Sequence, residues 1–126
     1  RGVHQDLRLA DPLAQHAVGL DAGVLREGIR EAEILVNTTS VGMHPHADDA
    51  LLVPEDALHS GLFVYDLVYN PPVTGLLAAA ARRGARTANG VRMLVLQGAA
   101  SFRIWTGQEP PVDVMERALR QALASR

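Results

Sequence analysis

The sequence predicts an α/β domain built on a parallel sheet, and two observations carry this prediction. Residues 34–36 and 62–69 are runs of strand-forming residues that are almost continuously apolar, which is typical of strands buried on both faces of a parallel sheet. Segments with apolar residues at helical spacing precede the first run and follow the second, and a loop with a short helix is expected between them. Strands that alternate with helices indicate an α/β fold. A chain of 126 residues, 48% of them hydrophobic, is long enough for one compact domain.

The first half of the chain contains a clear helix and a clear strand after an ambiguous start. Residues 1–17 fit no single period and predict at most a partial helix, and "HAVGL" (16–20) is a candidate short strand. Asp21 is a favourable N-cap for the next helix. The strand at 34–36 follows, and 44–61 is expected to be a loop with a short helix near Pro54. The apolar stripe of the first helix consists of Val24, Leu25, Gly28, Ile29 and Ala32.

The second half contains a strand, three helices and one further short strand. Two prolines end the strand at 62–69, Thr74 caps a helix that closes at Gly84, and "ARTAN" (85–89) is a candidate short strand. Residues 90–105 form a long helix with two apolar sides, and a last helix starts at Pro111. One side of the long helix carries Leu94, Gly98, Phe102 and Trp105, and the other carries Met93, Gln97, Ser101 and Ile104. The stripe of the last helix consists of Val112, Met115, Leu119 and Leu123.

Composition and charge narrow the class of function. A formal net charge of −2 argues against a nucleic-acid or membrane-surface partner, because such partners normally require a basic excess. The absence of cysteine excludes disulfides, thiolate metal sites and cysteine nucleophiles in this chain. All 12 basic residues are arginine, so no lysine can serve here as a catalyst or phosphate ligand. No apolar run approaches the length of about 18 residues that a membrane span needs, and we expect a cytoplasmic protein.

Two polar segments follow the predicted strands, where ligands bind in open parallel sheets. "NTTSVGM" (37–43) offers backbone amides and three hydroxyls around a tight turn, which suits a ribose, a diphosphate or a nicotinamide ring. The alternative is an ordinary strand exit made of common turn-forming residues. After the next strand, Asp66 and Tyr69 could orient a polar substrate. Alternatively, Asp66 caps a neighbouring turn and Tyr69 is half-buried with its hydroxyl in water.

Other candidates are weaker. Gln97 is a polar residue in an apolar row of the long helix, and such residues more often face solvent or bond to the backbone. His44 and His46 lie in a loop beside two aspartates, but their spacing suits no helix face, so we predict a solvated loop and no metal site. The chain contains neither a G-x-G-x-x-G nor a G-x-x-x-x-G-K-[ST] segment.

Five features follow one another along the chain: "ILVNTTSVGM", "YDLVYNPPVTGLL", a glycine at 84, "NGVRMLVLQGAASFRIWTG" and a proline near 110. Taken in this order they resemble shikimate dehydrogenases, the NADP-dependent enzymes that reduce 3-dehydroshikimate, and the resemblance covers residues 18–124. It implies an incomplete Rossmann-like, doubly wound parallel sheet with C-terminal helices.

The resemblance also implies roles for individual residues. Thr38, Thr39 and Ser40 would contact the dinucleotide near its nicotinamide. Leu67, where the family often has methionine, would line the nicotinamide pocket, and Gly90 and Met93 would border it. Tyr69 and Gln97 would reach the shikimate. The row of Met93 and Gln97 would then face the cleft, while Leu94, Phe102 and Trp105 pack into the domain.

Several segments of the family are not present in this chain. The catalytic lysine and aspartate lie in an N-terminal substrate domain, in segments such as "NVTxPxK" and "NTDxxG", and the diphosphate turn "GAGG" and the "NRT" segment are also missing. We therefore expect residues 1–105 to form part of a dinucleotide-binding domain and 106–126 a C-terminal helix that packs toward the substrate domain. This chain would supply no catalytic residue and would be inactive alone. Without the first two strands of a sheet ordered 3-2-1-4-5-6, "ILVN" would expose an apolar edge. We therefore expect either that the missing segments belong to the same molecule, or that this chain rearranges or pairs with another chain, as in a homo-oligomer.

The resemblance predicts part of an oxidoreductase that interconverts 3-dehydroshikimate and shikimate with NADP. One alternative is a quinate/shikimate dehydrogenase that uses NAD, because the residues that select the coenzyme lie outside this chain. A second alternative is a catalytically inactive dinucleotide-binding or interaction module.

Overall fold

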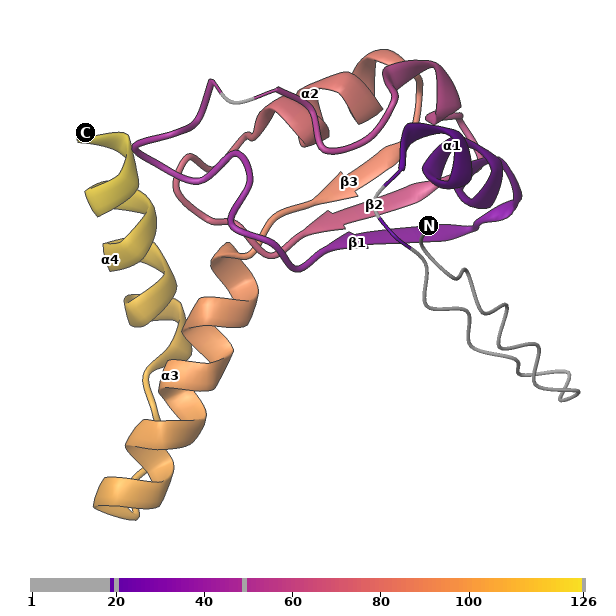
Figure 1. Ribbon diagram of the computed structural model, residues 1–126. Helices are drawn as coiled ribbons and strands as arrows, with labels where there is room; N and C mark the ends of the chain where they lie inside the picture. Colours follow the sequence, from indigo (N-terminus) through magenta and orange to yellow (C-terminus); the bar gives the residue numbers. More distant parts are fainter. Residues whose placement is uncertain (1–18, 20, 49, 126) are drawn as a thin grey trace, which may run out of the picture.

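The computed structural model describes residues 19, 21–48 and 50–125, and within them strands and helices alternate along the chain. The α/β prediction is confirmed (Figure 1). The predicted strand at 16–20 and the partial helix at 1–17 lie outside the described residues, apart from Gly19. The elements are α1 (Ala22–Glu31), β1 (Ile34–Asn37), the 3₁₀ helix η1 (Glu55–Ala57), β2 (Phe63–Asp66), α2 (Gly75–Arg82), β3 (Arg86–Ala88), α3 (Val91–Thr106) and α4 (Val112–Ala124).

The three strands form one parallel sheet in the order β1-β2-β3. Ile34 pairs with Phe63, which pairs with Arg86, and at the other end of the ladder Asn37 pairs with Asp66. All three strands therefore end at the same edge of the sheet. The expected strand at 85–89 is confirmed as β3, and the strand expected at 62–69 is shorter, because its last residues turn away into a loop.

The core lies on one face of the sheet, beneath α1, η1 and α2 (Figure 1). Val64 of β2 is fully buried there. Residues alternate between the two faces of a strand, so Ile34 and Val36 point to the opposite face, where 63% and 46% of their surfaces are exposed. The expectation that 34–36 is buried on both faces is therefore wrong. Within the described residues β1 is an outer strand of the sheet, and it is apolar as expected. The buried residues of the core are Ile29, Val53, Ala57, Leu58, Leu62, Val64, Leu76, Leu77, Ala79 and Ala80.

Both predicted N-caps on this face are confirmed. The Asp21 carboxylate accepts hydrogen bonds from the amides of Gly23 (2.9 Å) and Val24 (3.3 Å) at the start of α1. The Thr74 hydroxyl accepts one from the Leu77 amide (3.3 Å) at the start of α2. Each cap satisfies a helix amide that has no partner within the helix.

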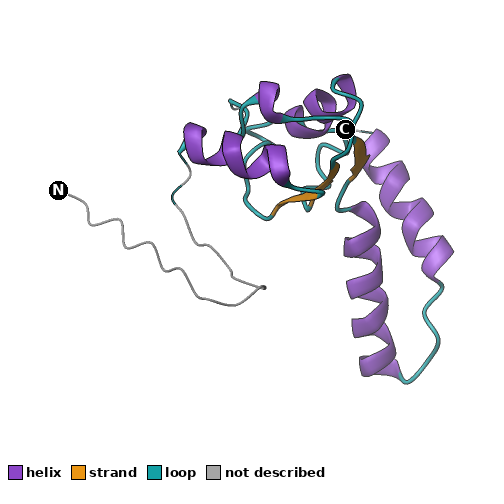
Figure 2. Cartoon of the chain, turned by 90° about the vertical axis from the view of Figure 1, so that its right-hand side faces the viewer, coloured by secondary structure: helices purple, strands orange, loops and turns teal. Residues whose placement is uncertain are grey.

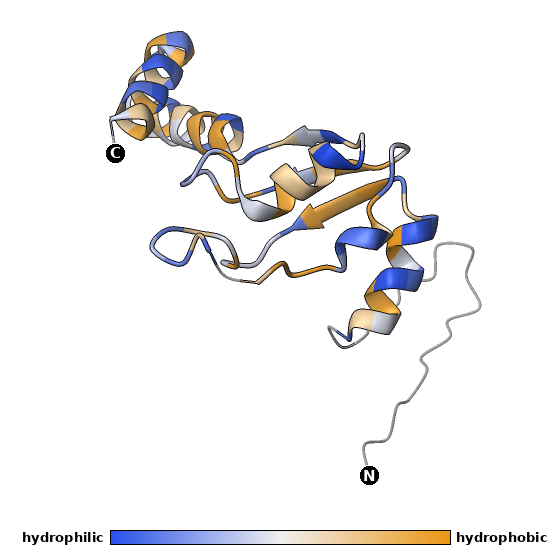
Figure 3. Cartoon of the chain, turned by 90° about the horizontal axis from the view of Figure 1, so that it is seen from above, coloured by the Kyte–Doolittle hydropathy of each residue, from blue (hydrophilic) through white to orange (hydrophobic). Residues whose placement is uncertain are grey.

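Helices α3 and α4 form a hairpin that extends away from the sheet (Figure 2). The buried row of α3 consists of Val91, Val95 and Ala99, whereas Trp105 is 82% exposed. The expectation that Trp105 packs into the domain is wrong, because this end of α3 extends past the sheet. Hydrophobic and hydrophilic residues alternate in bands along the hairpin (Figure 3). The predicted stripe of α4 is only half-buried. No helix among the described residues is long and apolar enough to cross a membrane.

Candidate functional site

The candidate site lies at the edge of the sheet where the three strands end. Asn37 ends β1, Asp66 ends β2 and Ala88 ends β3, and the chain leaves each strand into a polar or glycine-containing segment. The Leu67 amide donates to the carbonyl of Asn37 (3.0 Å), which extends the ladder by one residue and holds the first two exits side by side.

A buried hydrogen-bond network fixes these two exits. Asp66 is fully buried, and one of its carboxylate oxygens accepts hydrogen bonds from Asn37 Nδ2 and the Val68 amide, both at 3.0 Å. Its other oxygen accepts one from the Thr74 hydroxyl at 2.7 Å. Burial of a polar group is costly unless it is hydrogen-bonded, and these three bonds satisfy the carboxylate inside the protein. Asp66 therefore caps the turn after β2 through the Val68 amide, the alternative given for it above, and its carboxylate also joins this turn to Asn37 and Thr74.

The turn after β1 uses one of its three hydroxyls internally. Asn37 Oδ1 accepts hydrogen bonds from the amide (2.9 Å) and the hydroxyl (2.7 Å) of Thr39, and the Thr39 hydroxyl accepts one from the Val41 amide (3.2 Å). Thr38, Thr39 and Ser40 are all exposed at the sheet edge. The hydrogen bonds of Thr39 therefore stabilise the turn, and the side chains of Thr38 and Ser40 stay exposed.

The start of α3 packs closely against the segment that leaves β2. Gly90 is buried, and a Cβ atom at this position would lie 1.9 Å from the Leu67 carbonyl oxygen. Its φ of −76° is accessible to any residue, so glycine is required here for space and not for backbone conformation. The Gly90 amide also donates to the Val68 carbonyl (3.1 Å). The structure thus brings Leu67 and Gly90 into direct contact.

The remaining candidates are exposed side chains in the exit loop of β2 and on α3. Met93, on the first turn of α3, is 38% exposed, and Tyr69, two residues after Leu67, is 36% exposed. Gln97 is exposed one turn beyond Met93, about 10 Å along the helix axis from Gly90. These three side chains are open to a ligand, and the internal hydrogen bonds of the site do not use them. No group of three or more His, Asp or Glu residues in the described part of the chain is placed to hold a metal.

Sequence reasoning missed two members of the site. It placed Asn37 in the polar turn at 37–43 and treated Thr74 only as a helix cap, although both bind the Asp66 carboxylate. The available signal was the pairing of polar residues at the ends of neighbouring buried strands, because such residues must find partners inside the protein.

Together the three parallel strands and the helices that cover one face of the sheet define part of a Rossmann-like fold. Residues 90–120 match the family described as shikimate 5'-dehydrogenase C-terminal domain. A shikimate dehydrogenase (NADP(+)) of Methanothermobacter thermautotrophicus is 49% identical over 115 residues, which cover 91% of this chain and 41% of the relative. The chain belongs to the shikimate dehydrogenase family and corresponds to the C-terminal part of these proteins.

Solved structures agree with this assignment. A shikimate dehydrogenase in complex with NADP+ superposes with a TM-score of 0.74 at 39% identity, over 79% of this chain and 34% of that one. A quinate dehydrogenase of Corynebacterium glutamicum in complex with NAD has a TM-score of 0.72 at 35% identity, over 82% of this chain and 36% of that one. The chain spans about two-fifths of the length of the curated relatives it matches.

Proposed function

We propose that this chain forms the nicotinamide side of the cofactor and substrate site of a shikimate dehydrogenase, which interconverts 3-dehydroshikimate and shikimate with NADP. The observation that carries the proposal is the contact between Gly90 and the Leu67 carbonyl, because it places the start of α3 directly against the exit of β2. The names of the curated relatives and the solved complex with NADP+ support the choice of cofactor.

The residues at this edge fit a nicotinamide nucleotide by their chemistry. Leu67 and Met93 offer apolar side chains to a ring, and the turn at 38–40 offers hydroxyls and amides to a ribose or an amide group. Bound NADP would supply the hydride acceptor or donor. The chain's own contribution would be to bind the nicotinamide end, orient one of its faces toward the substrate and limit the access of water.

Tyr69 and Gln97 are the proposed substrate contacts. A phenol and a carboxamide can both donate and accept hydrogen bonds, which suits the hydroxyl groups of shikimate. Both side chains are exposed, and Gln97 lies one helical turn beyond Met93 on the same row of α3, so they could reach a substrate that lies against the nicotinamide.

The two parts of the chain would have different functions. Residues 1–105 would form the cofactor-binding part, and 106–126 would pack toward a substrate domain that supplies the catalytic groups. We assign no catalytic residue to this chain and expect no turnover from it alone. A cytoplasmic location, assembly as a homo-oligomer, and the lack of nucleic-acid and membrane partners remain predictions from the sequence.

The test is a nuclear magnetic resonance titration of the isotope-labelled chain with NADP+ and then with shikimate. NADP+ is expected to shift the amide signals of residues 38–40, 67, 90 and 93, and shikimate those near 69 and 97. Gln97→Ala should keep the NADP+ response and weaken the shikimate response about three- to tenfold, the effect of losing one hydrogen bond. Shifts confined to other surfaces, or an unchanged response to shikimate in the variant, would contradict the proposed roles.

The same titration distinguishes the alternatives. A stronger response to NAD and quinate than to NADP+ and shikimate would favour a quinate/shikimate dehydrogenase, an alternative supported by the similarity to the quinate dehydrogenase. A response to a dinucleotide but to neither acid would favour a cofactor-binding module without substrate contacts.

A further inference from the structure

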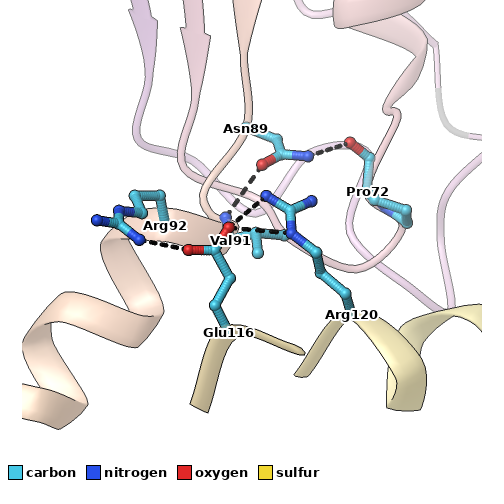
Figure 4. Close-up of polar contacts among 6 residues, drawn as sticks. All are labelled: Pro72, Asn89, Val91, Arg92, Glu116 and Arg120. Carbon is cyan, nitrogen blue, oxygen red and sulfur yellow. Dashed lines mark hydrogen bonds and ion pairs between the residues drawn. The ribbon is translucent and has the colours of Figure 1, made fainter. Parts of the chain in front are cut away.

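The side chain of Asn89 joins two segments that are far apart in the sequence. It lies between β3 and α3, where its Nδ2 donates to the Pro72 carbonyl (2.7 Å) and its Oδ1 accepts from the Val91 amide (3.2 Å) (Figure 4). The first bond reaches the loop that leaves β2, and the second satisfies an amide in the first turn of α3. One carboxamide therefore connects the exit loop of β2 with the start of α3.

The exit loop is held through its carbonyl groups, because Pro71 and Pro72 have no backbone N–H to donate. At Asn70 the carbonyl accepts from the His44 amide (2.8 Å), and at Pro72 the carbonyl accepts from Asn89. The loop is thus fixed through its carbonyl groups, one of them on the side of α3.

Three contacts made by two consecutive residues, Asn89 and Gly90, join this loop to the start of α3. Asn89 binds the Pro72 carbonyl, the Gly90 amide binds the Val68 carbonyl, and Gly90 lies so close to Leu67 that a Cβ atom would be 1.9 Å from the Leu67 carbonyl oxygen. Met93 belongs to the helical turn that begins at these contacts. The contacts of Asn89 and Gly90 therefore determine the spacing between Leu67 and Met93.

A neighbouring ion-pair cluster has a different role. Glu116 of α4 accepts hydrogen bonds from Arg92 of α3 and from Arg120 on its own helix (Figure 4). This cluster joins α3 to α4 but does not join the hairpin to the sheet. Asn89 supplies a side-chain connection between the start of the hairpin and the exit loop of β2.

We propose that Asn89 is a positioning residue that sets the separation of the two walls of the nicotinamide pocket, the loop at 67–72 and the first turn of α3. This inference rests on the proposed function, because it takes Leu67 and Met93 as the residues that flank the ring. Asn89 itself would contact neither the cofactor nor the substrate.

Asn89→Asp tests the proposal because it replaces the Nδ2 donor, which binds the Pro72 carbonyl, with an oxygen that can only accept. The new carboxylate still accepts from the Val91 amide, but it places an acceptor against the Pro72 carbonyl. We expect NADP+ binding to weaken about three- to tenfold, as for the loss of one hydrogen bond, with little change in the melting temperature. Gln108→Glu is the matched control, because it makes the same amide-to-acid exchange at the exposed turn between α3 and α4.

A second measurement separates this proposal from the proposed function. Hydrogen exchange of the Gly90 amide in the ligand-free chain should accelerate in Asn89→Asp and not in Gln108→Glu, since that amide binds the Val68 carbonyl. If the original chain does not bind NADP+, the proposed function fails, and exchange at Gly90 alone decides whether Asn89 positions α3. Unchanged exchange, or affinity lost only in proportion to stability, would overturn the proposal. Asn89→Ser, which keeps an acceptor without a new charge, replaces Asn89→Asp if that variant does not fold.

Discussion

Gly90 is the residue at which space is most limiting, and its replacement by alanine is expected to be severe. A Cβ atom would overlap the Leu67 carbonyl, and this oxygen belongs to the backbone and cannot rotate away as a side chain could. We expect Gly90→Ala to lower the free energy of unfolding by about 3 kcal/mol or more, at the upper end of overpacking effects. Denaturant unfolding followed by circular dichroism measures this change.

Gly28→Ala is the matched control for that substitution. Gly28 lies inside α1, and nothing lies within 4 Å of the position its Cβ would occupy. Alanine should stabilise the chain by about 0.5–1 kcal/mol, because glycine loses more backbone entropy in a helix. If both variants were equally stable, the close approach at Gly90 would not exist in solution.

At the scale of single residues, the sequence predicted which residues are polar but not which residues they would bind. Thr39 and Asp66 were recognised as polar residues at strand ends, but the sequence could not show that Asn37 and Thr74 would bind them. The residue types predicted a polar edge. The bond from Asn37 to Asp66 depends on how β1 and β2 align, and that register is fixed only when the strands pair.

At the scale of elements, the hairpin of α3 and α4 contains an acid-sensitive link. Hydrogen bonds from Arg120 and then from Arg92 hold the pKa of the Glu116 carboxyl below its usual value of 4.5. A carboxyl group whose pKa is lower in the folded state stabilises the protein above its unfolded pKa, and this stabilisation disappears as the pH falls through the folded pKa.

We therefore expect Glu116→Gln to lower the melting temperature at neutral pH, with a difference from the original chain that shrinks steadily below pH 4.5. Thermal unfolding from pH 7 to pH 3 measures it. Glu109→Gln is the control, because Glu109 pairs with Arg103 with its side chain 82% exposed, compared with 20% for Glu116. Exposed pairs contribute little, so this variant should differ less. A Glu116→Gln difference that is the same at every pH would contradict the assignment.

The helices were predictable in extent but less so in orientation. Asp21 and Thr74 marked helix starts correctly, because a cap is a local interaction between near neighbours. Trp105 was misplaced because helical spacing shows which residues share a face and not which face meets a neighbour. That depends on where the hairpin lies relative to the sheet.

At the scale of the whole molecule, helices cover one face of the sheet and leave the other largely exposed. The exposed face carries Ile34 and Val36 on the edge strand β1, and beside them Phe63 and Tyr65 of β2 are half-buried. The guanidinium of Arg86 covers part of the Phe63 ring, 5.8 Å from its centre. The sequence indicated apolar strands correctly, but burial on both faces requires a second layer that the described residues do not provide.

An apolar edge strand favours pairing with another strand, so we expect the chain to self-associate through β1 at high concentration. The double substitution Ile34→Lys with Val36→Lys should shift the equilibrium toward monomer, because charged side chains on an edge strand oppose pairing. Sedimentation velocity over a range of concentrations measures the association. Ile104→Lys is the control, since Ile104 is 80% exposed at the far end of the hairpin. A chain that stays monomeric at all concentrations, or an equal effect of Ile104→Lys, would show that the edge of β1 does not drive association.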